Sequence, residues 1–426
     1  MKLYKYPSFE LWPEICRRPV QDAQQILPVV SGIIKDVQQK GDAALRSFAK
    51  KFDGVDLPEL AVTAAEIKQA AAAVPPQLKA ALKQAKQNIE AFHRSQKEPV
   101  QKITPLKGVT CWRESRPVEK VGLYIPGGSA PLFSTVLMLG LPARIAGCKE
   151  VILCTPCNKE GKVHPAVLYA ASLCGITKIF KTGGAQAIAA MAYGTESIPR
   201  VFKIFGPGNQ YVTVAKQLVQ NKVAIDMPAG PSEVLVIADE TAQADFVAAD
   251  LLAQAEHGPD SQVILVSTNA ALIKKTERAI TQQLKVLPRN AIAAKALAHA
   301  RFVLVKNKEQ AVALSDFYAP EHLILACKTS TRLLKSITTA GSVFIGNYSP
   351  ESVGDYASGT NHTLPTNGYA AAYSGVSLDS FYKKITFQQL SVQGLQAIAG
   401  TVTTMAEAEG LQAHANAVTV RIKNKQ

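Results

Sequence analysis

The sequence lacks any apolar run approaching the length of a membrane-spanning helix, and residues 1–18 contain no apolar stretch typical of a signal peptide. We therefore expect a cytoplasmic protein. Acidic residues are also scarce, because 33 Asp and Glu against 47 Lys and Arg give a net charge of +14. Such an excess can indicate nucleic-acid binding. The basic residues are instead spaced along amphipathic patterns among Gln and Ala, which favours a solvated basic surface.

The cysteines do not indicate a disulfide framework, because the seven of them are an odd number and are scattered among apolar neighbours. In a reducing compartment they are interpreted as small buried hydrophobic residues. Cys154 and Cys157 have the spacing of a redox pair or of half a zinc site. No second pair with fitting spacing exists, and Cys154 ends a predicted buried strand, so we assign both to packing.

The chain of 426 residues is too long for one hydrophobic core, and we expect two or more domains. Two series of short apolar strands alternate with helical patterns, which is typical of α/β domains with parallel sheets. The N-terminal segment is interpreted as an arm outside any regular layer, and the C-terminal part as a helical tail. The predicted strands are residues 121–125, 151–154, 178–180, 203–205 and 223–225, then 234–238, 263–267, 302–305, 323–326 and 342–345. The predicted helices include residues 21–52, 63–74, 76–97, 387–399 and 404–414, followed by a strand-like segment at 417–422.

No Gly-x-Gly-x-x-Gly follows a predicted strand, so the usual dinucleotide fingerprint is absent. Three other glycine turns, at residues 124–128, 182–186 and 205–209, follow strands of the first series. They should gather at the carboxyl edge of one sheet, where backbone amides suit phosphate groups. Each could be a simple strand–helix turn, but three on one edge favour a nucleotide-sized ligand. Residues 226–233 form a rigid connector between the two series.

Four of the seven histidines, in contrast to His93, His164 and His299, lie beside a carboxylate, an amide or a glycine turn. Imidazole is the commonest metal ligand and titrates near neutral pH, so a metal site, an acid/base site or both are indicated. These four histidines are His257, His322, His362 and His414.

Gln254 and His257 are three residues apart near a predicted helix end, so they point the same way. They suit a metal site, although for this pair taken alone a solvated helix terminus is the favoured interpretation. Glu321 and His322 follow Pro320 in extended chain and point to opposite sides. That pair could flank a substrate or lie in water at the start of a strand.

Residues 354–362 show no periodicity, and a long irregular segment inside a domain is usually functional. This segment contributes Asp355 and His362, while His414 lies at the end of the last predicted helix. An oxygen and nitrogen set suited to zinc can be assembled from Gln254, His257, Asp355 and His414.

Together these motifs resemble the histidinol dehydrogenase family over nearly the whole chain. The segments that carry the resemblance are residues 121–131, 205–209, 226–233, 254–260, 320–322 and 355–362. The resemblance implies the oxidation of L-histidinol to L-histidine, through L-histidinal, with two NAD⁺ per turnover and with zinc. It also implies a homodimer in which the C-terminal tail reaches into the partner's site.

The same resemblance assigns individual roles. Zinc ligands would be Gln254, His257, Asp355 and, across the dimer, His414; Glu321 would activate water and His322 would be the general base. NAD would contact Tyr124, Gln186 and Asn209. Substrate would be bound by Ser232, Gln254, His257, His322, Asp355, His362, Glu409 and His414. The implied fold class has two α/β domains with incomplete Rossmann-like parallel sheets. Its parts would be an arm (1–20), a catalytic domain (21–123 with 233–376), an NAD-binding domain (124–232) and an exchanged helical tail (377–426).

Two other classes of protein are kept as alternatives. A cysteine-dependent aldehyde dehydrogenase would need a reactive thiol, for which Cys111 and Cys148 are candidates. A non-catalytic nucleic-acid-binding protein would use the positive charge and would need neither metal nor NAD.

Overall fold

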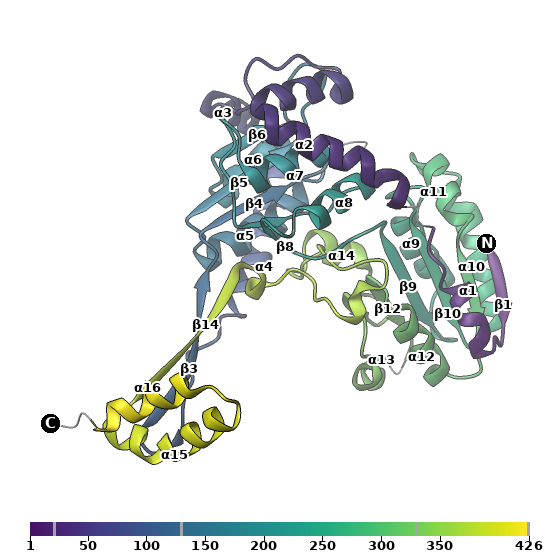
Figure 1. Cartoon of the computed structure of the whole chain (residues 1–426). Helices are drawn as coiled ribbons and strands as arrows, with labels where there is room; N and C mark the ends of the chain where they lie inside the picture. The colour runs from purple at the N-terminus through teal and green to yellow at the C-terminus, as the bar shows by residue number, and fades with distance from the viewer. Residues whose placement is uncertain (20–22, 128–130, 329, 424–426) are drawn as a thin grey trace. The chain divides into compact units, whose positions relative to one another are not determined.

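The computed structural model describes residues 1–19, 23–127, 131–328 and 330–423 (Figure 1). The chain divides into two compact units. The large unit comprises Met1–Gln96 and Val118–Phe381, and the small unit comprises Lys97–Pro117 and Tyr382–Gln426. No helix in the described ranges is long and apolar enough to cross a membrane.

The large unit contains a six-stranded parallel sheet with the order β1-β11-β10-β9-β12-β13. Its core strands are fully buried runs of Val, Ile and Leu, as expected for a parallel sheet that is covered on both faces. The strands are β1 (Lys2–Lys5), β9 (Glu233–Ala238), β10 (Gln262–Ser267), β11 (Arg301–Leu304), β12 (His322–Ala326) and β13 (Ser342–Ile345).

Alternate residues of β9 face two different helical layers. Val234 and Val236 pack with α9 (Ala244–Ala255), α10 (Ala270–Leu284) and α11 (Asn290–Leu297). Leu235 and Ile237 pack with α12 (Lys308–Tyr318) and α1 (Trp12–Ile15). The prediction of an N-terminal arm outside any layer is wrong at its start, because Lys2–Lys5 pairs with β11 as an edge strand. Backbone pairing decides this, since the segment buries little of its own surface.

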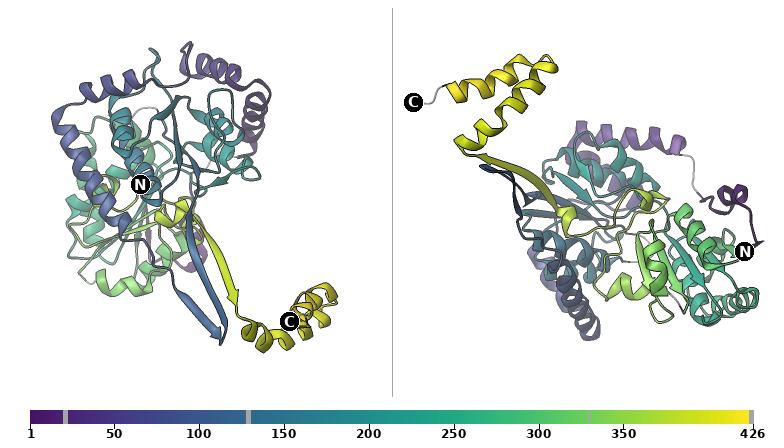
Figure 2. Two further views of the ribbon diagram at one scale, coloured as in Figure 1. Left: turned by 90° about the vertical axis from the view of Figure 1, so that its left-hand side faces the viewer. Right: turned by 90° about the horizontal axis from the view of Figure 1, so that it is seen from below.

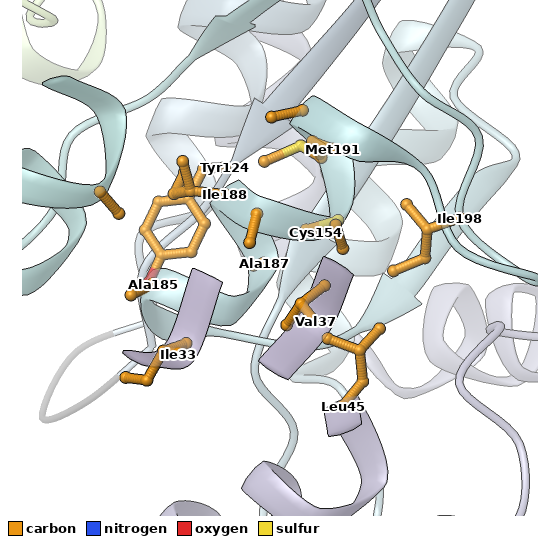
Figure 3. Close-up of a cluster of buried hydrophobic side chains, with 14 of the residues drawn as sticks. Ile33, Val37, Leu45, Tyr124, Cys154, Ala185, Ala187, Ile188, Met191 and Ile198 are labelled. Atoms are coloured by element: carbon orange, nitrogen blue, oxygen red, sulfur yellow. The ribbon is translucent and has the colours of Figure 1, made fainter. Parts of the chain in front are cut away.

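A second parallel sheet, of five strands, has the order β6-β5-β4-β7-β8. One face is covered by α2 (Ala23–Phe48), α7 (Gly184–Tyr193) and α8 (Gln210–Leu218), and Figure 3 shows side chains of α2 and α7 meeting Tyr124 and Cys154 of the sheet. The strands are β4 (Lys120–Tyr124), β5 (Glu150–Thr155), β6 (Lys178–Lys181), β7 (Lys203–Phe205) and β8 (Ala224–Ile225). The other helices associated with this sheet are α3 (Ala64–Ala73), α4 (Pro76–Arg94), α5 (Phe133–Ala146) and α6 (Pro165–Cys174).

Both sheets share one order of succession. In the five-stranded sheet, β4, β5 and β6 follow one another toward one edge, whereas β7 and β8 lie on the other side of β4. In the six-stranded sheet, β9, β10 and β11 do the same, whereas β12 and β13 lie on the other side of β9. The strand order therefore reverses between β4 and β7 and between β9 and β12. Ligands of such sheets bind where the order reverses. The α/β class with two Rossmann-like parallel sheets is confirmed.

The small unit is built on an antiparallel sheet of β2 (Lys102–Leu106), β3 (Val109–Pro117) and β14 (Tyr382–Leu390), and it ends in α15 (Val392–Ala408) and α16 (Gln412–Lys423). Figure 2 shows the long ribbon of β3 and β14. Two sequence predictions are wrong here. Residues 387–390 extend β14 instead of starting a helix, because they pair with β3, and the β-branched segment 417–422 is helical.

Candidate active site

Three residues predicted to contact NAD line one cavity of about 1220 Å³ in the large unit. Tyr124 ends β4, Gln186 lies in the first turn of α7, and Asn209 caps α8 by accepting a hydrogen bond from the Val212 amide at 3.1 Å. The Tyr124 hydroxyl accepts a hydrogen bond from the Gly184 amide at 3.0 Å, and burial raises the pKa of this hydroxyl to about 12.

The glycine turns do gather at the carboxyl edge of the five-stranded sheet, where they line this cavity. A side chain at Gly127 or at Gly183 would collide with the Pro156 ring, since an added Cβ would lie 2.1 Å and 2.8 Å from its atoms. Glycine is therefore required for the turns to approach each other. Gly128, Ser129 and Ala130 of the first motif lie outside the described residues.

Glu321 and His322 lie where β12 begins, next to β9, and not at a carboxyl edge. Both side chains are buried, with 8% and 5% exposed, which excludes a solvated pair. The Glu321 carboxylate accepts a hydrogen bond from the Glu233 amide at 2.8 Å. His322 Nδ1 lies 3.0 Å from the Glu233 carbonyl oxygen. Since a carbonyl only accepts, Nδ1 carries the proton and Nε2 is left as the basic nitrogen.

His322 Nε2 faces Asp355 Oδ1 at 3.5 Å and makes no hydrogen bond to any residue in the described part of the chain. Burial opposes protonation of this imidazole, but the carboxylates of Glu321, Asp355 and Glu351 outweigh it and hold the pKa of His322 well above its usual value. Burial also raises the pKa of Glu321 to about 8. The site thus surrounds a buried imidazole with carboxylates, and the Nε2 atom of this imidazole faces Asp355.

Asp355 interacts with the other two predicted site imidazoles of the large unit, His257 and His362. Burial opposes its ionisation, yet His322, His362 and His257 together lower its pKa below the usual value. His362 Nε2 also lies 3.3 Å from the Thr135 hydroxyl of α5. The structure therefore brings His257, His322, Asp355 and His362 together from three separate segments.

Asp355 is not in an irregular loop. The prediction that residues 354–362 are structureless is wrong at their start, because Glu351–Tyr356 forms the short helix α14. This helix packs against α9 and is held close to β13, where a Cβ on Gly354 would lie 2.5 Å from the Phe344 ring. Gly354 is explained by this close approach, which sequence periodicity cannot report.

Gln254 is fully buried near the end of α9. With its amide oriented to satisfy both neighbours, the nitrogen donates to Glu351 Oε1 at 2.9 Å and the oxygen accepts from the Glu233 amide at 2.9 Å, a donor that it shares with Glu321. Glu351 Oε2 has no hydrogen-bond partner among the described residues, and burial is the main reason why the pKa of Glu351 is raised well above its usual value. Neither Glu351 nor Glu233 was assigned a role from the sequence, because each acts through contacts made only in the fold.

The remaining predicted site residues are placed as follows. Ser232 is half-buried immediately before β9. Glu409 follows α15 and His414 lies in α16, so both belong to the small unit. Across the described ranges, no three His, Cys, Asp or Glu side chains form a metal-binding group. The four predicted zinc ligands would not form such a group of three within the large unit, because Gln254 is an amide and His414 belongs to the small unit.

Of the two candidate thiols for the alternative chemistry, Cys111 lies half-buried in β3 of the small unit and Cys148 is not activated. Burial raises the pKa of Cys148 to about 12, and all seven cysteines are free of disulfides. A thiol of raised pKa is a poor nucleophile. Cys154 is completely buried in β5, as expected for a packing residue.

Comparison with known proteins decides the family. Residues 16–422 match the family model described as histidinol dehydrogenase. The chain belongs to the histidinol dehydrogenase family. Histidinol dehydrogenase from Bacteroides fragilis is 58% identical over 424 residues, covering 99% of each chain, and that from Xylella fastidiosa is 55% identical over 408 residues, covering 95% of each. The crystal structure of histidinol dehydrogenase from Elizabethkingia anophelis matches with a TM-score of 0.97 at 55% identity, covering 99% of this chain and 98% of that one.

Membership of the histidinol dehydrogenase family confirms the resemblance inferred from the motifs and makes the chain an oxidoreductase. It accounts for the whole chain, since nearly every residue is covered. A non-catalytic nucleic-acid-binding role is not needed to explain the basic surface.

Proposed function

We propose that the chain catalyses the four-electron oxidation of L-histidinol to L-histidine through L-histidinal, the final steps of histidine biosynthesis, with NAD and zinc. The observation that supports it most directly is the buried Glu321–His322 pair beside Asp355, with His322 Nε2 left without a hydrogen bond among the described residues. Membership of the histidinol dehydrogenase family supports the reaction class.

The cavity at the carboxyl edge of the five-stranded sheet is suited to NAD. It is lined by Tyr124, Gln186 and Asn209 and by glycine turns whose backbone amides can bind phosphate groups. NAD would accept a hydride in each of the two oxidations.

The residues beside His322 fit a zinc ion. Gln254, His257 and Asp355 provide an amide oxygen, an imidazole and a carboxylate, and the negative charge around His322 is of the kind that a bound cation neutralises. We propose these three residues and the partner subunit's His414 as ligands. Zinc held there would orient the imidazole and amine of the substrate.

In the first oxidation, His322 Nε2 takes the proton of the substrate hydroxyl while the hydride leaves the same carbon for NAD⁺. The Glu233 carbonyl holds the opposite nitrogen, so that Nε2 is the atom presented. Glu321 then removes a proton from water as the water oxygen adds to the aldehyde, and His322 returns its proton to the former carbonyl oxygen, which completes the gem-diol and leaves His322 neutral. His322 accepts a proton from one gem-diol hydroxyl as the second hydride leaves, and the resulting carboxylic acid releases its remaining proton to solvent to give the carboxylate. His362, Ser232 and the partner subunit's Glu409 would hold the substrate.

We further propose a cytoplasmic homodimer. In the small unit few side chains are buried, and Val100, Ile103 and Met405 expose 51%, 61% and 60% of their surface. Exposed apolar area of this kind calls for a partner, and a second copy would cover it while supplying Glu409 and His414.

The stoichiometry of the reaction tests the proposal. Complete consumption of histidinol should yield two NADH per histidinol, and a chelator should remove this activity until zinc is added back. A yield of one NADH with accumulated histidinal, or full activity after verified zinc removal, would contradict the proposed reaction.

A further inference from the structure

Arg18, shortly after α1, forms a bidentate ion pair with Glu233, the first residue of β9. Its Nε lies 2.5 Å from Glu233 Oε1 and its Nη2 donates to Glu233 Oε2 at 3.0 Å. Nη2 also donates to the Tyr318 carbonyl at 2.6 Å, and the guanidinium lies 4.0 Å from the centre of the Tyr318 ring. A guanidinium that binds a carboxylate in a bidentate manner and is also stacked on an aromatic ring has little freedom to move.

The side chain of Glu233 is held by Arg18, and the main chain of Glu233 forms hydrogen bonds to Glu321 and His322. Its amide donates to Glu321 and its carbonyl accepts from His322 Nδ1. The carboxylate, 3% exposed, receives Arg18 on one side and the Asn367 amide at 2.7 Å on the other. Among the residues that the structure describes, no second side-chain cation pairs with this carboxylate.

We propose that Arg18 is a positioning residue for the reaction, acting through Glu233. By clamping the carboxylate it fixes the peptide groups that place Glu321 and keep the proton of His322 on Nδ1. The inference rests on the proposed roles of Glu321 and His322. Without Arg18 a buried carboxylate loses its counter-charge, and the first residue of β9 must shift to reach another partner.

A matched ion pair lies at the other end of the same strand. Lys308 Nζ lies 2.6 Å from Asp239 Oδ2, directly after β9, and the two side chains are 25% and 2% exposed. Neither residue is hydrogen-bonded to Glu321 or His322 in the described contacts. Lys308→Met therefore removes a comparable pair without altering the groups that hold the catalytic residues.

The test compares Arg18→Met, Arg18→Lys and Lys308→Met at saturating zinc, with kcat and KM measured for histidinol and for histidinal. We expect Arg18→Met to lower both kcat values about 10- to 100-fold, the range seen when groups behind an active site are lost. The KM for NAD should not change, because the proposed cofactor cavity is built on the other sheet. Arg18→Lys keeps the positive charge but cannot form the bidentate contact with the carboxylate, and it should give an intermediate kcat. Lys308→Met should keep its kcat within about twofold, as for an independent site.

A double variant separates positioning from general destabilisation. Arg18→Met with Glu233→Gln removes the unpaired charge, so the melting temperature should recover while kcat stays low. Recovery of kcat together with stability would overturn the inference, as would an Arg18→Met kcat equal to that of Lys308→Met. If Arg18→Met does not fold, Arg18→Lys and the double variant decide by the same criteria. His322→Asn serves as the reference: activity retained there contradicts the proposed function, whereas activity lost there but kept in Arg18→Met contradicts only the positioning role.

Discussion

At the scale of single residues, His322 should be essential for both oxidations. Its Nε2 is the basic nitrogen, and an asparagine cannot accept a proton there. We expect His322→Asn to lower kcat for histidinol and for histidinal about 10²- to 10⁴-fold, as for loss of a general base. Zinc content, measured by atomic emission, should be unchanged, and a variant that loses its zinc would contradict the assignment as base.

Glu321 should matter for one of the two steps more than for the other. Burial raises its pKa to about 8, its carboxyl group accepts a hydrogen bond from the Glu233 amide, and water activation is its proposed role. We expect Glu321→Gln to form histidinal from histidinol at a rate much closer to wild type than its rate of histidinal oxidation. Single-turnover measurements of each half-reaction check this. Equal losses in both would argue against water activation.

At the scale of elements, the ion pair of Asp239 and Lys308 directly after β9 should stabilise the fold without taking part in catalysis. Burial opposes ionisation of Asp239, but Lys308, the Thr241 hydroxyl and the backbone amides of Thr241 and Lys328 outweigh it and lower its pKa. Because the folded pKa lies below the unfolded value of about 3.9, ionised Asp239 stabilises the fold above that pH. This contribution is lost as the pH falls through the folded pKa.

Replacement of Asp239 by Asn should therefore cost most near neutral pH. The difference in free energy of unfolding between wild type and variant should stay level down to about pH 5 and shrink as the pH falls below about 4, because the wild type then loses the same interaction. Urea titrations at several pH values measure this difference. A difference that is constant across the range would mean that the carboxylate does not contribute through its charge.

At the scale of the whole molecule, the proposed exchange of tails between subunits can be tested by mixing. His414 lies in the small unit and His322 in the large unit, so variants at these positions would damage different contributions to one shared site. Heterodimers of His414→Asn and His322→Asn chains should regain about half of the wild-type activity, because one of two shared sites is then intact. Homodimers of each variant are the controls. No recovery in verified heterodimers would mean that each site is built from one chain.

Much of this molecule is determined locally by its sequence. Short apolar runs that alternate with helical patterns predicted both parallel sheets, and the three glycine turns could be placed on one edge because the carboxyl ends of parallel strands meet there. The spacing of Gln254 and His257 and the short apolar strand after His322 are also local features. They are visible because helices and strands impose fixed repeats on neighbouring residues.

Only the tertiary structure decided which groups act together. The edge strand Lys2–Lys5, the extension of β14 to Leu390 and the helix at Asp355 depend on partners distant in the chain. The same holds for Glu233, which contacts Arg18, 215 residues earlier in the sequence, and Glu321 and His322, 88 and 89 residues later. Local patterns cannot report such contacts, since the free energy of burying a charge or a peptide group depends on what surrounds it in space.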